Sequence, residues 1–108
     1  MLIGTREKLV MIGDSVTDCG RAYPYGEGNG AMGNGYSQYV QSLLDMNYPE
    51  RYIRVINMGI GGNTSEDLRN RWQQDALDLK PDWVSIMIGI NDVWRQFDRF
   101  LMTECHIA

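Results

Sequence analysis

Three short apolar runs along the chain have the length of β-strands and end close to a glycine. They occupy residues 8–12, 52–57 and 83–88. Gly13 follows the first run, Gly59 comes shortly after the second, and Gly89 follows the third. Apolar runs bounded by turn residues are typical of strands. The third run is apolar at both alternating sets of positions except at Ser85, so we expect a strand that helices cover on both faces.

Two segments between these runs have helical periodicity. Residues 36–46 carry an apolar stripe on one side and stop before Pro49. Residues 65–79 also have an apolar face, and Thr64 with Asp67 resembles a capping box ahead of them. The order β-α-β-α-β, with helices long enough to cross over the sheet, predicts right-handed βαβ units and a parallel sheet.

A glycine-rich segment, residues 19–35, separates the first strand from the first helix. We expect either a mobile surface loop or, because it leaves directly from Ser15, a loop that lines the mouth of a site. Residues 28–33 match the pattern G-x-G-x-x-G. A dinucleotide fingerprint must follow a strand directly, and the nearest strand has ended at Ile12, so we interpret the motif as a flexible glycine loop.

Composition narrows the class of protein. The chain has 108 residues, 44% of them hydrophobic, a net charge of −4 and neither internal repeat nor linker. We expect one soluble domain over residues 1–108. No basic stripe is present, which argues against a nucleic-acid partner, and no run approaches the ~20 apolar residues of a membrane span. Cys19 and Cys105 are expected to be reduced, and the predicted location is cytoplasmic.

Candidate chemistry gathers where the predicted strands end. Ser15 follows the first strand in Gly-Asp-Ser, Gly62 follows the second in Gly-Gly-Asn, and Asn91 follows the third in Gly-Ile-Asn-Asp. The carboxyl ends of strands in an open α/β sheet meet at one crevice, where such folds bind ligands. A serine hydroxyl, a glycine N–H and an asparagine amide brought together there supply most of an acyl-transfer site.

Each of these motifs has a plainer interpretation. Asp14 and Ser15 can simply cap a helix, the glycines can serve a turn that needs positive φ, and Asn91 can cap a short helix over residues 92–97. The functional interpretation rests on their joint occurrence, because three unrelated turns would have to follow three different strands in the same way.

These blocks resemble those of the GDSL or SGNH hydrolases, a superfamily of serine esterases and lipases. Residues 10–18, Val-Met-Ile-Gly-Asp-Ser-Val-Thr-Asp, are similar to its first block. Residues 55–65, with Gly61-Gly62-Asn63, are similar to the second, and Gly89-Ile90-Asn91-Asp92 is similar to the third. The blocks stand in the family's order and span most of the chain.

The resemblance implies a flavodoxin-like three-layer α/β/α fold with a parallel sheet of about five strands and the first strand inside the order 2-1-3-4-5. It further implies that Ser15 is the nucleophile and that the backbone N–H groups of Ser15 and Gly62 and the side-chain amide of Asn91 form the oxyanion hole. We prefer Gly62 to Gly59 or Gly61 because its spacing fits the block best. No metal or organic cofactor is implied, and the implied substrate is a small-molecule acyl ester of a carbohydrate, a lipid or a small alcohol.

The chain departs from the family at the fourth block, Asp-x-x-His. Its one histidine, His106, stands in Thr-Glu-Cys-His, soon after Asn91, and does not match. We therefore expect the amino-terminal portion of a longer hydrolase domain, cut after the third strand, with weak or no turnover by itself. The cut would expose the apolar edge of residues 83–88, which a second copy or a complementing chain would cover.

Three functions follow as hypotheses. The first is a serine esterase that acts through an acyl-enzyme and needs a base supplied from elsewhere. The second is a non-catalytic module of the same fold that holds a small anion on its N–H groups. The third is a flavodoxin-like nucleotide binder that uses the glycine-rich segment.

Overall fold

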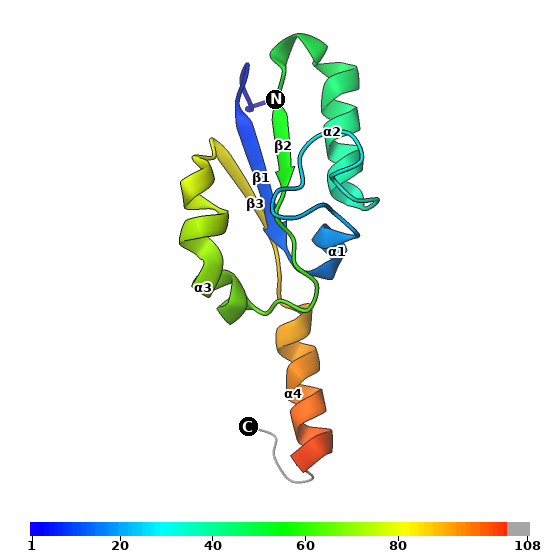
Figure 1. Cartoon of the computed structure of the whole chain (residues 1–108), viewed down its shortest axis with the longest axis vertical. Helices are drawn as coiled ribbons and strands as arrows, with labels where there is room; N and C mark the ends of the chain where they lie inside the picture. Colours follow the sequence, from blue (N-terminus) through cyan, green and yellow to red (C-terminus); the bar gives the residue numbers. More distant parts are fainter. Residues whose placement is uncertain (104–108) are drawn as a thin grey trace.

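The computed structural model describes the backbone of residues 1–103 and the side chains of residues 1–97. A parallel sheet in the order β2-β1-β3 forms its centre. The strands are β1 (Lys8–Gly13), β2 (Arg54–Asn57) and β3 (Trp83–Met87) (Figure 1). The predicted strands, their parallel pairing and the inner position of the first strand are confirmed.

Strand β1 is the middle of the sheet, and both of its faces are covered. Leu9 and Met11 lie in one apolar cluster, whereas Val10 and Ile12 lie in another on the opposite face. All four side chains are buried. A strand that alternates its side chains between two cores must be apolar throughout, which is why its sequence shows a continuous apolar run.

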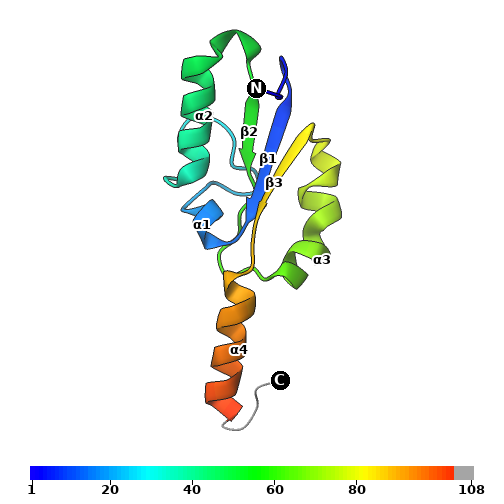
Figure 2. The ribbon, with the colours of Figure 1, turned by 180° about the vertical axis from the view of Figure 1, so that it is seen from behind.

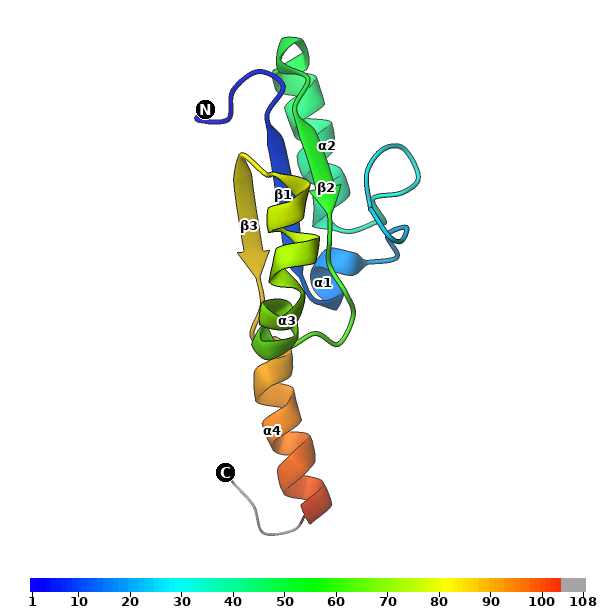
Figure 3. The same cartoon turned by 60° about the vertical axis from the view of Figure 1, so that its left-hand side comes forward.

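Helices on opposite faces of the sheet complete three layers (Figures 2 and 3). Helix α2 (Tyr36–Asn47) contributes Tyr36, Val40 and Leu44 to the cluster around Leu9 and Met11. Helix α3 (Ser65–Asp75) contributes Leu68 and Trp72 to the cluster around Val10 and Ile12. The predicted capping box of α3, Thr64 with Asp67, is present.

The ends of two elements differ from the prediction. The expected helix over residues 65–79 is interrupted at Ala76, which has φ −124° and is fully buried, and a short 3₁₀ helix, η2 (Leu77–Leu79), follows. The second strand begins at Arg54 rather than residue 52, because Tyr52 has φ 49° at the end of η1 (Pro49–Arg51). Positive φ is incompatible with a strand, so the start of β2 is set by a turn that periodicity does not reveal.

The prediction that helices cover both faces of the third strand is wrong for the residues that the structure describes. Ile86 and Met87 in β3 are 54% and 49% exposed. Helix α4 (Ile90–Thr103) leaves the end of β3 and extends away from the sheet instead of packing on it (Figure 1). The apolar edge that the sequence led us to expect at the third strand is therefore present.

The glycine-rich segment between α1 (Ser15–Asp18) and α2 is anchored to the sheet. Met32 and Arg21 are buried, and Gly26 forms an antiparallel bridge with Asn57 at the end of β2. The glycines of the G-x-G-x-x-G pattern lie within this segment, and the helix α1 stands between them and β1. Within residues 1–103, no helix has both the length and the apolar character needed to cross a membrane.

Candidate active site

The carboxyl ends of the three strands carry the predicted site residues at one edge of the sheet. Ser15 is the first residue of α1, Gly62 lies in the loop from β2 to α3, and Asn91 lies in the first turn of α4. A Cβ atom added at Gly61 would lie 3.7 Å from the Ser15 Cβ atom, and the Asn91 amide donates to the Asn63 carbonyl at 3.0 Å. The loop around Gly62 therefore touches both other residues.

Ser15 is exposed because the chain turns sharply from β1 into α1. Asp14 is buried and caps α1, accepting a hydrogen bond from the Val16 N–H at 3.0 Å. The preceding Gly13 leaves no room for a side chain, since a Cβ atom there would lie 2.3 Å from the Met87 carbonyl oxygen. Asp14 thus provides the capping that the plainer interpretation assigned to both residues, and Ser15 remains exposed at the surface.

The loop from β2 to α3 leaves a single N–H group without an acceptor among the described residues, that of Gly62. The N–H of Gly59 donates to Asn57 Oδ1, and that of Ile60 donates to the Gly13 carbonyl. The N–H of Gly61 donates to Asp18 Oδ2, and that of Asn63 donates to the Ile60 carbonyl. Gly62 also has φ +83°, which directs its peptide differently from its neighbours'. Hydrogen bonding thus favours Gly62 over Gly59 and Gly61 as an oxyanion donor, as the block spacing did.

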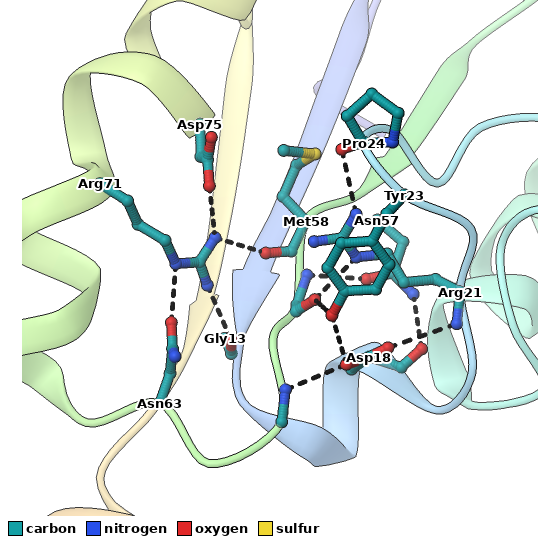
Figure 4. Close-up of polar contacts among 12 residues, drawn as sticks. Gly13, Asp18, Arg21, Tyr23, Pro24, Asn57, Met58, Asn63, Arg71 and Asp75 are labelled. Atoms are coloured by element: carbon teal, nitrogen blue, oxygen red, sulfur yellow. Dashed lines mark hydrogen bonds and ion pairs between the residues drawn. The ribbon is translucent and has the colours of Figure 1, made fainter.

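Asp18 holds this loop against α1. Its Oδ2 atom accepts the Gly61 N–H at 3.0 Å and the Tyr23 hydroxyl at 2.7 Å (Figure 4). Burial acts to raise the pKa of Asp18, but the hydrogen bonds from Tyr23, Gly61 and Arg21 outweigh it and leave the pKa below its ordinary value. Tyr23 stacks on the buried Arg21 guanidinium, which donates to the Gly59 carbonyl at 2.7 Å. One end of the glycine-rich segment therefore borders the site.

The start of α4 is fastened to the same loop. Arg95 donates to the Gly62 carbonyl at 2.6 Å, and Asp92 accepts the Ser65 N–H at 3.0 Å. Asn91 lies inside α4, not before a helix over residues 92–97 as its capping role required. Its NH₂ group has two hydrogens, so one can still be donated to a ligand while the other is bound to Asn63.

A cleft of about 580 Å³ lies beside these residues, between the amino-terminal end of α3 and α4. The residues that line it are all polar or charged in type: Thr64, Ser65, Glu66, Asp67, Asp92, Arg95 and Gln96. Ser15 is not part of the lining. The nucleophile candidate is exposed and lies outside this cleft.

The residues that would complete a catalytic triad are not found in the described part. His106 lies outside the described residues. Within that part, no group of three or more histidine, cysteine, aspartate or glutamate side chains is arranged to hold a metal ion. The sequence analysis did not identify Arg71 or Arg95 as contacts of the site. The sequence signal that could have indicated Arg71 is a charged residue next to Trp72, on the side of the helix that packs against the sheet.

Comparison with known proteins gives consistent matches. A model of the GDSL-like lipase/acylhydrolase family matches residues 11–104. An acetylxylan esterase from Geobacillus stearothermophilus is 62% identical over 108 residues, which are 99% of this chain and 49% of that protein. The crystal structure of Axe2, an acetylxylan esterase from that organism, matches with a TM-score of 0.91 and 61% identity, over 100% of this chain and 50% of that one.

A second solved structure is similar. LAE5, an α/β hydrolase from the metagenome of Lake Arreo in Spain, matches with a TM-score of 0.87 and 51% identity, over 98% of this chain and 50% of that one. The solved structures of Axe2 include catalytic mutants in which a serine, an aspartate or a histidine is replaced by alanine. The chain spans about half the length of the esterases that it matches.

Proposed function

The chain belongs to the GDSL-like lipase/acylhydrolase family, and on this premise we propose that it acts as a serine esterase that removes acetyl groups from acetylated carbohydrates such as xylan. The single observation that carries the proposal is the Gly62 N–H, which has no acceptor among the described residues, near an exposed Ser15 in a loop whose other N–H groups all have acceptors. An oriented donor without an acceptor is what an oxyanion hole offers before substrate binds.

In the proposed reaction the Ser15 Oγ atom attacks the ester carbonyl carbon. The carbonyl oxygen becomes an oxyanion, which accepts hydrogen bonds from the N–H groups of Ser15 and Gly62 and from the Asn91 amide. The Ser15 proton passes to a general base outside the described residues and from there to the alcohol that leaves. Water then attacks the acyl-enzyme through the same base, which releases acetate and restores the serine.

The test is covalent labelling combined with turnover of the protein made from its full reading frame. We expect a fluorophosphonate to modify Ser15, and Ser15→Ala to lower kcat/KM on 4-nitrophenyl acetate and acetylated xylo-oligosaccharides by about 10³-fold or more. Ser42→Ala is the matched control, because Ser42 is exposed on α2 and its hydroxyl bonds, among the described residues, only within that helix. A protein that is neither labelled nor active on either ester would rule out the esterase.

A non-catalytic module that binds a carboxylate is the second candidate, because a donor such as the Gly62 N–H also suits an anion. It predicts saturable acetate binding, measured by the movement of the Gly62 amide resonance, in a protein without esterase activity. A nucleotide binder is the third candidate. A titration with a mononucleotide that gives no heat change would exclude it.

We further propose that a second copy of the chain or a complementing chain covers the open edge of β3 and the apolar side of α4. Ile86, Met87, Trp94 and Phe97 are all about half exposed or more, and an apolar strand edge readily pairs with another chain. Sedimentation of a stable monomer at all concentrations would contradict this. We also propose that residues 1–108 belong to one domain and that the protein is cytoplasmic. Cys19 forms no disulfide among the described residues, which agrees with a reducing compartment, and cell fractionation tests the location.

A further inference from the structure

Arg71 on α3 forms polar contacts near the site with residues outside its own helix. Its guanidinium donates to four oxygen atoms: Asn63 Oδ1 at 2.7 Å, the Met58 carbonyl at 2.7 Å, the Gly13 carbonyl at 3.0 Å and Asp75 Oδ2 at 3.1 Å. The side chain is only 13% exposed. Figure 4 shows the guanidinium between the end of β1, the exit of β2 and α3.

Two of these partners, Gly13 and Asn63, adjoin the groups of the proposed site. The Gly13 carbonyl lies at the turn that presents Ser15, and it also accepts the N–H of Ile60 in the loop from β2 to α3. Asn63 directly follows Gly62, and its carbonyl accepts the Asn91 amide. One planar cation therefore contacts the segments that carry Ser15 and Gly62, and the second of these segments in turn binds the Asn91 amide. Gly13 and Arg71 are 58 positions apart in the sequence.

We propose that Arg71 is a positioning residue that sets the distance between the Ser15 turn and the Gly62 N–H. This inference rests on the proposed function. Oxyanion stabilisation depends on where the donors lie relative to the reacting carbonyl, and small displacements weaken it strongly. Arg71 touches none of the reacting atoms and acts through the carbonyl and amide oxygens that it holds.

A guanidinium is suited to this role and an ammonium is not. Its five N–H donors lie in one rigid plane and reach several acceptors at once, whereas a lysine ammonium is a single flexible point charge. Arg21 lies on the other side of the loop and also binds a loop carbonyl, that of Gly59. Its remaining donors go to Ala22 and Pro24 in its own segment, so it does not connect the Ser15 turn to the loop.

Arg71→Lys is the test, with Arg54→Lys as the matched control. Arg54 is an exposed arginine that pairs with Glu27 at the start of β2, the opposite end of the strand from the site. Active sites are titrated with a fluorophosphonate so that kcat is expressed per competent site. We expect Arg71→Lys to lower kcat about 10- to 100-fold with KM within about threefold of the parent value.

A second readout does not depend on activity. We expect the amide resonance of Gly62 to shift, and its exchange with water to accelerate, in Arg71→Lys and not in Arg54→Lys. If Arg71→Lys does not fold, Asn63→Ala removes one acceptor of the guanidinium and should produce the same pattern at smaller amplitude.

The outcomes separate the two proposals. A kcat per titrated site within about twofold of the parent, together with an unmoved Gly62 amide, overturns the positioning role. A parent protein without labelling or turnover, but with a Gly62 amide that moves in Arg71→Lys, removes the esterase and leaves the control of the loop by Arg71 standing. An inactive parent protein with an unmoved amide overturns both.

Discussion

At the scale of single residues, the site depends on glycines where backbone segments approach closely and on buried polar side chains that join those segments. Gly13 and Gly59 are required by close backbone approach, since added Cβ atoms would lie 2.3 Å and 2.4 Å from neighbouring backbone atoms. Asn57 is fully buried, and its amide donates to the carbonyls of Thr17 and Met32, which ties α1 and the glycine-rich segment to β2.

Replacing Gly59 should therefore destabilise the protein. A Cβ atom in Gly59→Ala would meet the Asp18 nitrogen, which belongs to a helix backbone and cannot move aside cheaply. We expect the free energy of unfolding in urea to fall by about 1–3 kcal/mol. Gly61→Ala is the control, because its Cβ atom would make only ordinary contacts, and an equal loss in both variants would refute the steric argument.

Asp18 should make stability depend on pH in acid. Its folded pKa lies below the ordinary value of 3.8, so its contribution is present above that value and is lost as the pH falls through the lowered one. The stability difference between the parent and Asp18→Asn is therefore expected to be constant near neutrality and to shrink below about pH 4. Urea titrations across this range check it; a difference that grows in acid would reverse the sign.

At the scale of elements, local sequence signals explain the beginnings of helices better than their ends. The capping box of α3 uses Thr64 and Asp67, which are near each other in sequence and therefore visible in it. The break at Ala76 is not visible, because Ala has high helix propensity and only burial against the sheet accounts for its non-helical backbone. The extent of α4 is likewise not visible in the sequence, because the helix spans Ile90–Thr103 whereas the predicted segment covers only residues 92–97.

The capping box gives a direct test at this scale. Thr64→Ala removes the acceptor of the Asp67 N–H and should lower the free energy of unfolding by about 1 kcal/mol. Thr64→Ser keeps the hydroxyl and should restore most of the loss. If serine and alanine were equally destabilising, the contribution of Thr64 would come from its methyl group instead.

At the scale of the whole molecule, two buried clusters flank β1, while β3 and α4 present apolar side chains to solvent. Trp94 and Phe97 on α4 are 59% and 62% exposed. Grouped apolar side chains at a surface mark an interface or an aggregation site. This arrangement is the structural basis of the proposed association.

Charge on α4 should weaken that association. We expect Phe97→Glu to lower the mass measured by sedimentation at a given concentration, because a carboxylate resists transfer from water into an apolar contact. Tyr39→Glu is the control, since Tyr39 is 66% exposed on α2, away from the open edge. Identical sedimentation of Phe97→Glu and the parent would show that α4 is not the surface used.

The sequence by itself determined the strand order, the parallel pairing, the two covering helices and the strand ends that carry Ser15, Gly62 and Asn91. These features follow from periodicity, from turn residues and from the resemblance of short blocks, all of which are written in neighbouring residues. Only the tertiary structure decided which loop N–H stays without an acceptor, which glycines are sterically required and that Arg71 joins the segments of the site. Those properties depend on partners distant in the chain, such as Gly61 with Asp18 and Arg71 with Gly13, which are 43 and 58 positions apart. Hydrogen bonds and close contacts form between atoms that folding brings together, and no local pattern in the sequence records which atoms those are.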